Sequence, residues 1–380
     1  MKLEQTQWTE SRGWEPATPR EMKTADLALV FSSTARLEDA GCLEEIKCAY
    51  PHALIFGCST AGEIHDVHVD DDSIAVTAID FEHTELRYAG IRMFDVTNSY
   101  DAGERLAQIL PHEGLVHVFV LSDGLKVNGS DLVKGLSARL PEGVSITGGL
   151  SGDGDRFAKT LVILEGKPQS DAIGAIGFYG DALRVGYASL GGWDSFGPER
   201  LITRSEGNVL YELDGKSALE LYKQYLGKHA AGLPATGLLF PLSLRTRDGE
   251  TPVVRTILGV DEEAQSMTFA GDVPMGAYAR LMKANFDRLI DGAVGAARTS
   301  HEAVDGSSPD LAILISCVGR KMVLKQRVEE EVEGVRDVLG EHTALAGFYS
   351  YGEISPFTPH AKCELHNQTM TITTLSERAA

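Results

Sequence analysis

Apolar runs of strand length alternate with helical patterns along the chain. Residues 26–34 form one such apolar run, a glutamate-rich helical stretch covers residues 37–49, and a second apolar run begins at residue 53. Short apolar runs bounded by turn residues predict buried strands, and apolar residues at a spacing of three to four predict a helix. This part of the chain is therefore expected to fold as a strand–helix–strand unit.

The same order of elements recurs twice, in residues 115–154 and in residues 310–354. Connecting two parallel strands through a helix is the ordinary right-handed crossover. Short β-like runs at 160–164, 172–179 and 183–190 follow the second unit and are typical of antiparallel strands. The sequence thus predicts an α/β fold built from repeated strand–helix–strand units, with mixed sheets and antiparallel additions.

A second set of β-like runs occupies residues 238–269, beyond a Pro- and Gly-containing stretch at 228–237. Such a stretch is typical of a domain boundary. Residues 275–297 are predicted to form one long helix with Asn285 on its polar side. A chain of 380 residues is long enough for two packed domains, which agrees with a boundary near the middle.

Each of the three units ends in a glycine-rich segment. These segments are GCSTAGEI at 57–64, GGLSGDG at 148–154 and GFYSYGEI at 347–354, and the first and third share the frame G-x-x-x-x-G-E-I. Ligands collect beyond the carboxyl ends of parallel strands, and glycine lets the backbone approach a ligand closely. We expect the three segments to face one shared cleft, the alternative being tight turns without a functional role.

The candidate ligand-binding residues lie in these segments and in the polar start of the last strand. They are Gly57, Cys58, Ser59, Gly62, Glu63, Gly149, Ser151, Gly352, Glu353, Asn367 and Thr369. Glu63 and Glu353 occupy equivalent positions in two copies of one turn. They either accept hydrogen bonds from nearby loop amides or hold an ammonium or amide group of a small ligand.

Charge and composition exclude several classes of function. Thirty-five Lys and Arg against 55 Asp and Glu give a net charge of -20, which repels nucleic acid and anionic lipid and favours a basic patch on a protein partner. The polar N-terminus and the lack of a long apolar run predict a cytoplasmic protein without a membrane span. The 5 cysteines are scattered, as in reduced proteins.

The motifs of common enzymes are missing from the sequence. There is no phosphate-binding G-x-x-x-x-G-K, neither Ser59 nor Ser151 completes G-x-S-x-G, and the histidines form no zinc-binding pattern. We therefore predict a binding protein rather than an enzyme. The alternative is a hydrolase that uses Ser59 or Cys58 as nucleophile, with Glu63 or Glu353 as base.

Five segments in this order resemble the FIST proteins: 57–64, 148–154, 208–215, 352–354 and 365–369. The resemblance covers nearly the whole chain. It implies an N-terminal extension (1–23), a FIST N-terminal domain (24–227) and a FIST C-terminal domain (237–376).

The resemblance implies a sensory function. FIST proteins are regarded as small-ligand sensors in signal transduction, with amino acids proposed as ligands. They are often encoded beside, or fused to, histidine kinases, cyclic-di-GMP enzymes or chemoreceptors. The expected function is a cytoplasmic sensor that binds a small molecule between its two FIST domains and regulates a separate signalling enzyme of this kind.

The chain also resembles the stand-alone bacterial nitric-oxide sensors of this family, which bind haem and regulate a histidine kinase. This resemblance suggests haem b with His366 as the axial ligand of the iron, oriented by Asn367 and Gln368. Met370, Phe348, Tyr349 and Tyr351 are the expected pocket walls, and Cys363 is an alternative thiolate ligand. The other interpretations of this segment are a structural strand end and an amino-acid site without haem.

Overall fold

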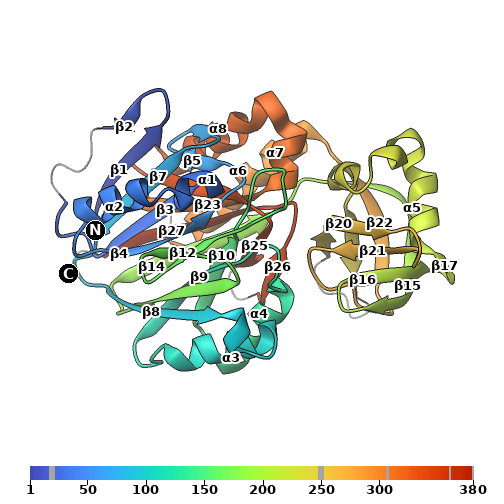
Figure 1. Cartoon of the computed structure of the whole chain (residues 1–380), viewed down its shortest axis with the longest axis horizontal. Helices are drawn as coiled ribbons and strands as arrows, with labels where there is room; N and C mark the ends of the chain where they lie inside the picture. The colour runs from blue at the N-terminus through green and yellow to red at the C-terminus, as the bar shows by residue number, and fades with distance from the viewer. Residues whose placement is uncertain (17–21, 247–251, 305–307, 359–360, 379–380) are drawn as a thin grey trace.

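The computed structural model describes the chain except residues 17–21, 247–251, 305–307, 359–360 and 379–380. Figure 1 shows a large α/β body and, beside it, a smaller domain made mainly of strands. The large body contains three mixed sheets, and the smaller domain contains a curled antiparallel sheet. The α/β fold with mixed sheets and antiparallel additions predicted from the sequence is confirmed.

The first sheet has the strand order β12-β11-β4-β3-β7-β1-β2. Its central strands β3 and β4 are parallel, as predicted, and helices α1 (Thr34–Glu38) and α2 (Ala40–Ala49) connect them. The strands are β1 (Lys2–Thr9), β2 (Gly13–Glu15), β3 (Leu27–Ser32), β4 (Leu54–Ser59), β7 (Ile74–Asp80), β11 (Val162–Leu164) and β12 (Lys167–Gln169). The residues expected to form an N-terminal extension thus include β1, which pairs with β7.

The second sheet has the order β26-β25-β10-β9-β13-β8. Strands β9 and β10 are parallel and are connected by α4 (Gly129–Arg139), against which α3 (Ser99–Ile109) packs. The strands are β8 (Glu85–Arg92), β9 (Leu115–Ser122), β10 (Ser145–Leu150), β13 (Ala172–Tyr179), β25 (Gly352–Pro356) and β26 (Cys363–His366).

The third sheet has the order β14-β27-β23-β24-β5-β6. Parallel strands β23 and β24 are connected by α7 (Val318–Leu324) and α8 (Val328–Leu339), and α6 (Phe286–Glu302) packs against α8. The strands are β5 (Glu63–His65), β6 (His68–Asp70), β14 (Leu183–Leu190), β23 (Leu311–Cys317), β24 (Ala344–Ser350) and β27 (Met370–Glu377).

The three sheets are related by a cyclic exchange of hairpins. In every repeat, the hairpin that follows the second parallel strand leaves its own sheet and joins another one. Hairpin β5–β6 follows β4 but pairs with β24; β11–β12 follows β10 but pairs with β4; β25–β26 follows β24 but pairs with β10. The three repeats therefore interlock, and each sheet is completed by residues from elsewhere in the chain.

The smaller domain, residues 194–283, is inserted into the third repeat between β14 and α6. We call it the β domain. Its elements are β15 (Asp194–Glu206), β16 (Val209–Leu213), β17 (Lys216–Ser217), α5 (Ala218–Leu226), β18 (Leu242–Arg245), β19 (Val253–Arg255), β20 (Ile257–Asp261), β21 (Ser266–Phe269) and β22 (Tyr278–Lys283). Its sheet takes strands from both sides of the stretch 228–237, and it has an apolar core of its own.

The long helix predicted for residues 275–297 is wrong in its first half. That half contains strand β22, and helix α6 begins only at Phe286. Asn285 caps this helix, because its side chain accepts a hydrogen bond from the Arg288 amide. The sequence Y-A-R-L-M-K of β22 buries alternate positions at its start and pairs with both β15 and β18, and these tertiary contacts override its helical propensity.

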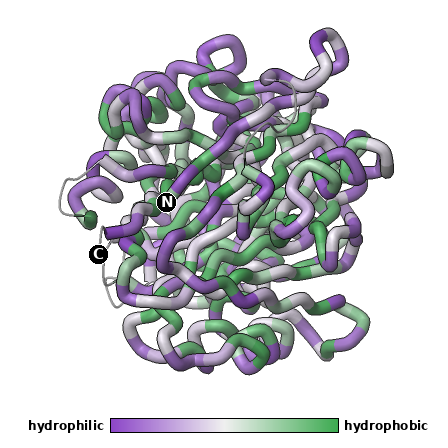
Figure 2. Tube along the Cα trace, turned by 90° about the vertical axis from the view of Figure 1, so that its left-hand side faces the viewer, coloured by the Kyte–Doolittle hydropathy of each residue, from purple (hydrophilic) through white to green (hydrophobic). Residues whose placement is uncertain are grey.

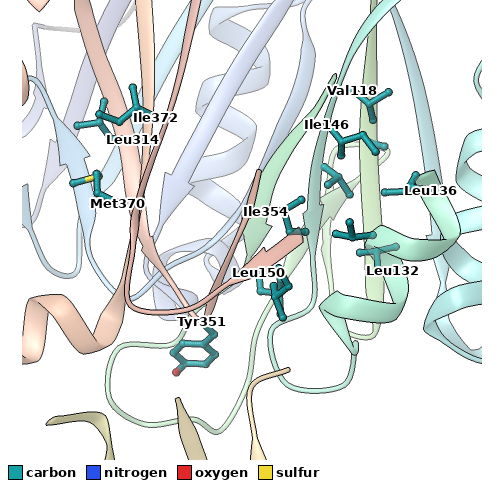
Figure 3. Close-up of a cluster of buried hydrophobic side chains, with 14 of the residues drawn as sticks. Val118, Leu132, Leu136, Ile146, Leu150, Leu314, Tyr351, Ile354, Met370 and Ile372 are labelled. Carbon is teal, nitrogen blue, oxygen red and sulfur yellow. The ribbon is translucent and has the colours of Figure 1, made fainter. Parts of the chain in front are cut away.

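Apolar side chains from all three sheets meet inside the body. Phe31, Phe119 and Phe348 belong to one cluster, and the rings of Phe31 and Phe348 are 4.8 Å apart between centroids. Figure 2 shows apolar segments inside the body and polar segments along its periphery. Figure 3 shows a second cluster, in which Leu132 and Leu136 of α4 face the second sheet. Among the described residues, no helix is long and apolar enough to cross a membrane.

Gly57, Gly148 and Gly347 hold equivalent positions in β4, β10 and β24. At each of them, a Cβ atom would overlap a main-chain carbonyl oxygen of the neighbouring parallel strand. Real Cβ atoms do not approach backbone so closely, so these positions require glycine because of space, whatever their other roles.

We expect Gly347→Ala to destabilise the protein by roughly 3 kcal/mol, because the added methyl group overpacks a strand pair that cannot move apart. Urea unfolding followed by circular dichroism measures the change. The matched control is Gly259→Ala, also in a strand, where a Cβ meets nothing within 4 Å. The control should stay within about 0.5 kcal/mol of the parent. Equal stability of the two variants would contradict the steric argument.

Candidate functional site

The three glycine-rich turns lie against one another. The first or second residue after each of β4, β10 and β24 donates its amide to the last or next-to-last residue of another of these strands, so that the bonds close a ring. The three hydrogen bonds run from Ala61 N to Tyr349 O (2.8 Å), from Gly152 N to Ser59 O (2.8 Å) and from Tyr351 N to Leu150 O (3.2 Å). The structure therefore brings together the turns that contain most of the candidate residues.

The centre where the turns meet is closed by packing. Cys58, Ser59 and Ser151 are fully buried. Ser59 Oγ donates to Gly152 O (2.7 Å) and accepts from Leu161 N (2.8 Å), so its hydroxyl holds the second turn in place. Burial raises the pKa of the Cys58 thiol well above its ordinary value. This environment suits structural side chains rather than nucleophiles.

Glu63 is buried next to the first turn and has three donors. Thr60 donates its hydroxyl to one carboxylate oxygen, and Ser73 donates its amide (3.1 Å) and its hydroxyl (2.8 Å) to the other. Burial raises the pKa of Glu63 to about 7, against the opposing effect of these hydrogen bonds.

Glu353 repeats this arrangement in the third turn. It accepts from the hydroxyl of Ser350 (2.7 Å) and from the amide (3.1 Å) and hydroxyl (2.9 Å) of Thr369. Burial raises its pKa to about 8. Of the two roles open from the sequence, this geometry favours the acceptor of loop hydrogen bonds for both glutamates, and it makes Thr369 a partner of Glu353.

The other candidates near the third turn lie in the interior. Asn367 is fully buried; its Oδ1 accepts from Thr256 N (3.4 Å), and its Nδ2 finds no partner in the described part of the chain. In the pairing of β10 with β25, Gly149 lies opposite Glu353 and Gly352 lies opposite Leu150. Around both glycines, side chains fill the space that a Cβ would need.

His366 is enclosed in the same region, with 1% of its surface exposed. Its Nε2 donates to Ser355 O (2.7 Å), its ring lies 4.1 Å from that of Phe357, and its buried Nδ1 has no partner within the described residues. Burial lowers its pKa to about 4, so the imidazole is neutral at pH 7. Nδ1 has a free lone pair, but among the described residues the side chain is enclosed by packing.

The remaining residues expected around haem also pack inside. Phe348, Tyr349 and Met370 are fully buried, and Tyr351 stacks on Phe157 at 4.4 Å. Cys363 donates to Ile146 O (3.4 Å), and burial raises the pKa of its thiol, which disfavours the thiolate that a haem iron needs. As placed, these residues do not fit haem, and haem binding stays a prediction. Among the described residues, no group of three or more His, Cys, Asp or Glu is arranged to hold a metal.

An open cavity of about 510 Å³ lies beside the first turn. We call it the turn pocket. Its walls come from the carboxyl ends of β3, β4, β10 and β23, where ligands of α/β proteins usually bind. It is lined by Ser33, Thr60, Ala61, Gly62, Glu63, Asp71, Asp72, Gly154, Asp155, Arg156, Val318, Lys321, Met322 and Lys325. Of the candidate residues predicted from the sequence, Gly62 and Glu63 line it.

Lys321 of α7 reaches the first turn from the third repeat. Its Nζ donates to Ala61 O (2.9 Å) and forms an ion pair with Asp71. Gly62 adopts φ +137°, and a Cβ there would meet Lys321 Nζ. Glycine at this position therefore permits both the turn and the approach of the ammonium group.

The charges of the turn pocket are only partly paired. Arg156 binds the buried carboxylate of Asp153 (2.6 Å). Burial of Asp153 tends to raise its pKa, but the hydrogen bonds from Arg156 and Thr34 outweigh this effect and lower it. Asp72, Asp155 and Lys325 line the pocket and form no ion pair within the described residues.

The cationic side of this pocket was not predicted from the sequence. It depends on helix α7, which begins at Val318, directly after β23. Lys321 and Lys325 then lie one helical turn apart, at the edge where the strands end. The sequence does contain a signal for these lysines. Basic residues follow directly after the first buried strand of the third unit, which corresponds to the first strand of the first unit.

The comparisons with known proteins agree with the motifs. The FIST N domain matches residues 26–216 and the FIST C domain matches residues 218–356. FIST domains are associated with the sensing of small ligands in signal transduction, and they are sensory rather than catalytic.

Two individual proteins were also found. An uncharacterized protein of Methanocaldococcus jannaschii is 26% identical over 225 residues, which cover 55% of this chain and 41% of that protein. The chain thus matches less than half the length of this relative. A crystal structure of cyanuric acid hydrolase from A. caulinodans covers 78% of this chain and 100% of its own, at 10% identity and a TM-score of 0.19, and it carries no argument. On the two matching domains, which together span most of the sequence, the chain belongs to the FIST family.

Proposed function

We propose that this protein is a sensor that binds a small zwitterionic ligand, such as a free amino acid, in the turn pocket. One observation carries the proposal: the pocket lies between FIST N and FIST C residues and has unpaired charges of both signs. Lys325 suits a carboxylate, whereas Asp72 and Asp155 suit an ammonium group. A cavity of about 510 Å³ is within the usual range for a small-molecule site.

The remaining features of the pocket support binding rather than catalysis. The side chains that a hydrolase would use, Cys58 and Ser59, are buried behind the turn, and Glu63 is held by Thr60 and Ser73. The cations that line the pocket can orient a ligand, but no activated nucleophile faces them among the described residues. The protein is therefore proposed to have no enzymatic activity.

The output of the sensor is proposed to pass to a separate signalling enzyme, such as a histidine kinase or a cyclic-di-GMP enzyme. A net charge of -20 favours a partner with a basic docking surface. The signal would leave the pocket through α7, which carries Lys321, ends directly before Lys325 and packs between the body and the β domain.

Lys325→Asn should weaken binding of the responsive amino acid roughly five- to tenfold, because one charge-assisted contact to its carboxylate is lost. A thermal-shift screen of the standard amino acids identifies the ligand, and isothermal titration calorimetry measures its affinity. Lys228→Asn, a change at another exposed lysine, is the matched control. No saturable binding by any amino acid, or equal affinity of the two variants, would overturn the proposed site.

Gly62→Ala should abolish this binding while the protein stays folded, because the added Cβ displaces Lys321 and φ +137° strains any residue except glycine. Calorimetry on the folded variant measures the loss. The control is Gly114→Ala, which also has a positive φ but lies away from the pocket, where a Cβ meets nothing within 4 Å. Retention of full affinity by Gly62→Ala would contradict the assignment of the first turn.

A haem titration tests the alternative suggested by the resemblance to nitric-oxide sensors. Because Nε2 of His366 is engaged and its ring is enclosed, we expect the same absorption spectrum from the parent and from His366→Gln after haem is added. A stoichiometric Soret band in the parent that is lost in the variant, with both proteins folded, would restore the haem interpretation.

A further inference from the structure

A second cavity, of about 690 Å³, lies between the body and the β domain. We call it the interdomain cavity. Helix α4 and strand β26 form its wall on the body, and in Figure 1 both lie on the side that faces the β domain. Strands β18 and β19 and the loop before β22 form the opposite wall. None of its lining residues lines the turn pocket.

Half of the residues that line this cavity are apolar. They include Val133 and Ala138 from α4 and Leu244, Val253, Pro274 and Ala277 from the β domain. Apolar surface that stays in water between two domains costs free energy, and an apolar ligand would remove it from water.

Arg255 is the buried charged group of this cavity, with 6% of its surface exposed. Its Nε donates to Asp272 O (3.1 Å), and its Nη1 donates to Leu365 O (2.9 Å) and Val254 O (3.2 Å). All three acceptors are neutral carbonyl groups. Within the described residues, neither a carboxylate nor any other group accepts a hydrogen bond from Nη2.

Two carboxylates, Asp272 and Glu364, line the cavity and attract the guanidinium electrostatically. The carboxylate of Asp272 is already used, because it accepts from Asn128 Nδ2 (3.0 Å) and forms an ion pair with Lys134. Burial lowers the pKa of Arg255 to about 10, so the guanidinium is still charged at neutral pH. A buried cation without an anionic hydrogen-bond partner is costly, and an anion bound next to it would lower that cost.

A second cation lies at the exposed edge of the cavity. Lys362 lines it and forms no ion pair within the described part of the chain. With Lys134 paired to Asp272, the cations Arg255 and Lys362 outnumber the remaining carboxylate, Glu364. This charge balance and the apolar side chains favour a ligand with one negatively charged head group and an apolar body.

We propose that the interdomain cavity binds an apolar carboxylate, with its head group on the guanidinium of Arg255 and its apolar chain between α4 and the β domain. Arg255 already joins the two domains through Leu365 O, so this ligand would add contacts across the same boundary. The proposal concerns a different ligand and a different site from the turn pocket and does not depend on it.

The probe is octanoate, measured by calorimetry on the whole protein. We expect saturable binding of one octanoate per chain, and binding of the uncharged analogue octanol and of the short carboxylate acetate to be at least roughly tenfold weaker. Ala138→Phe places an aromatic ring in the cavity from an exposed position on α4, and it should weaken octanoate binding by a similar factor. Ala303→Phe, an exposed position at the end of α6, is the matched control and should bind as the parent does.

Arg255→Gln should also weaken octanoate binding roughly tenfold, and its thermal unfolding shows whether the domains stay folded. Ala138→Phe keeps the proposal testable if Arg255→Gln unfolds. No saturable binding of octanoate, equal binding of octanol, or unchanged affinity in Ala138→Phe would each overturn the proposal. Lys325→Asn should leave octanoate binding unchanged, so failure of the amino-acid site and failure of this site can be distinguished.

Discussion

The ring of main-chain hydrogen bonds between the three turns is the constraint on which the rest of the body depends. Each turn can reach its neighbour only because its strand lies directly against the parallel strand beside it, which requires glycine at positions 57, 148 and 347. Because each turn is hydrogen-bonded to a strand of another repeat, the hairpin that follows the turn continues into another sheet. Buried amides and carbonyls need partners, and this crossing supplies them. The interlocked order of the three sheets follows from it.

This constraint also explains why most of the conspicuous polar residues of the turns serve the fold. Ser59, Glu63 and Glu353 satisfy amides and hydroxyls that the crossing buries. The turn pocket forms where the first and third repeats meet. After β23 the chain enters α7 at once, and Lys321 from this helix reaches the first turn. Charges without internal partners gather at this junction, which is typical of a ligand site.

Much of the fold could be predicted from local patterns, because each parallel pair and its helix are adjacent in sequence and have the expected periodicity. The hairpin exchange could not be predicted in this way. Ile64 of β5 pairs with Gly347 of β24, which lies far away in the sequence, and no local pattern indicates this pairing. The sequence identified Gly62 and Glu63 at the pocket but not Lys321 or Lys325, because the seven-residue helix α7 leaves little periodicity to detect. The interdomain cavity depends on the position of the β domain, so it could not be predicted from local sequence patterns either.

Helix α7 connects the turn pocket with the β domain through Arg320. This side chain is fully buried, pairs with Glu331 (2.6 Å) and donates to Gly191 O (2.8 Å) and Leu289 O (2.7 Å). Gly191 and Leu289 lie at the two points where the chain leaves the body for the β domain and returns to it. Breaking a buried ion pair costs about 3–5 kcal/mol, so both connections should move with α7 rather than separately from it. A ligand that contacts Lys321 therefore acts on the same short helix that holds the β domain in place.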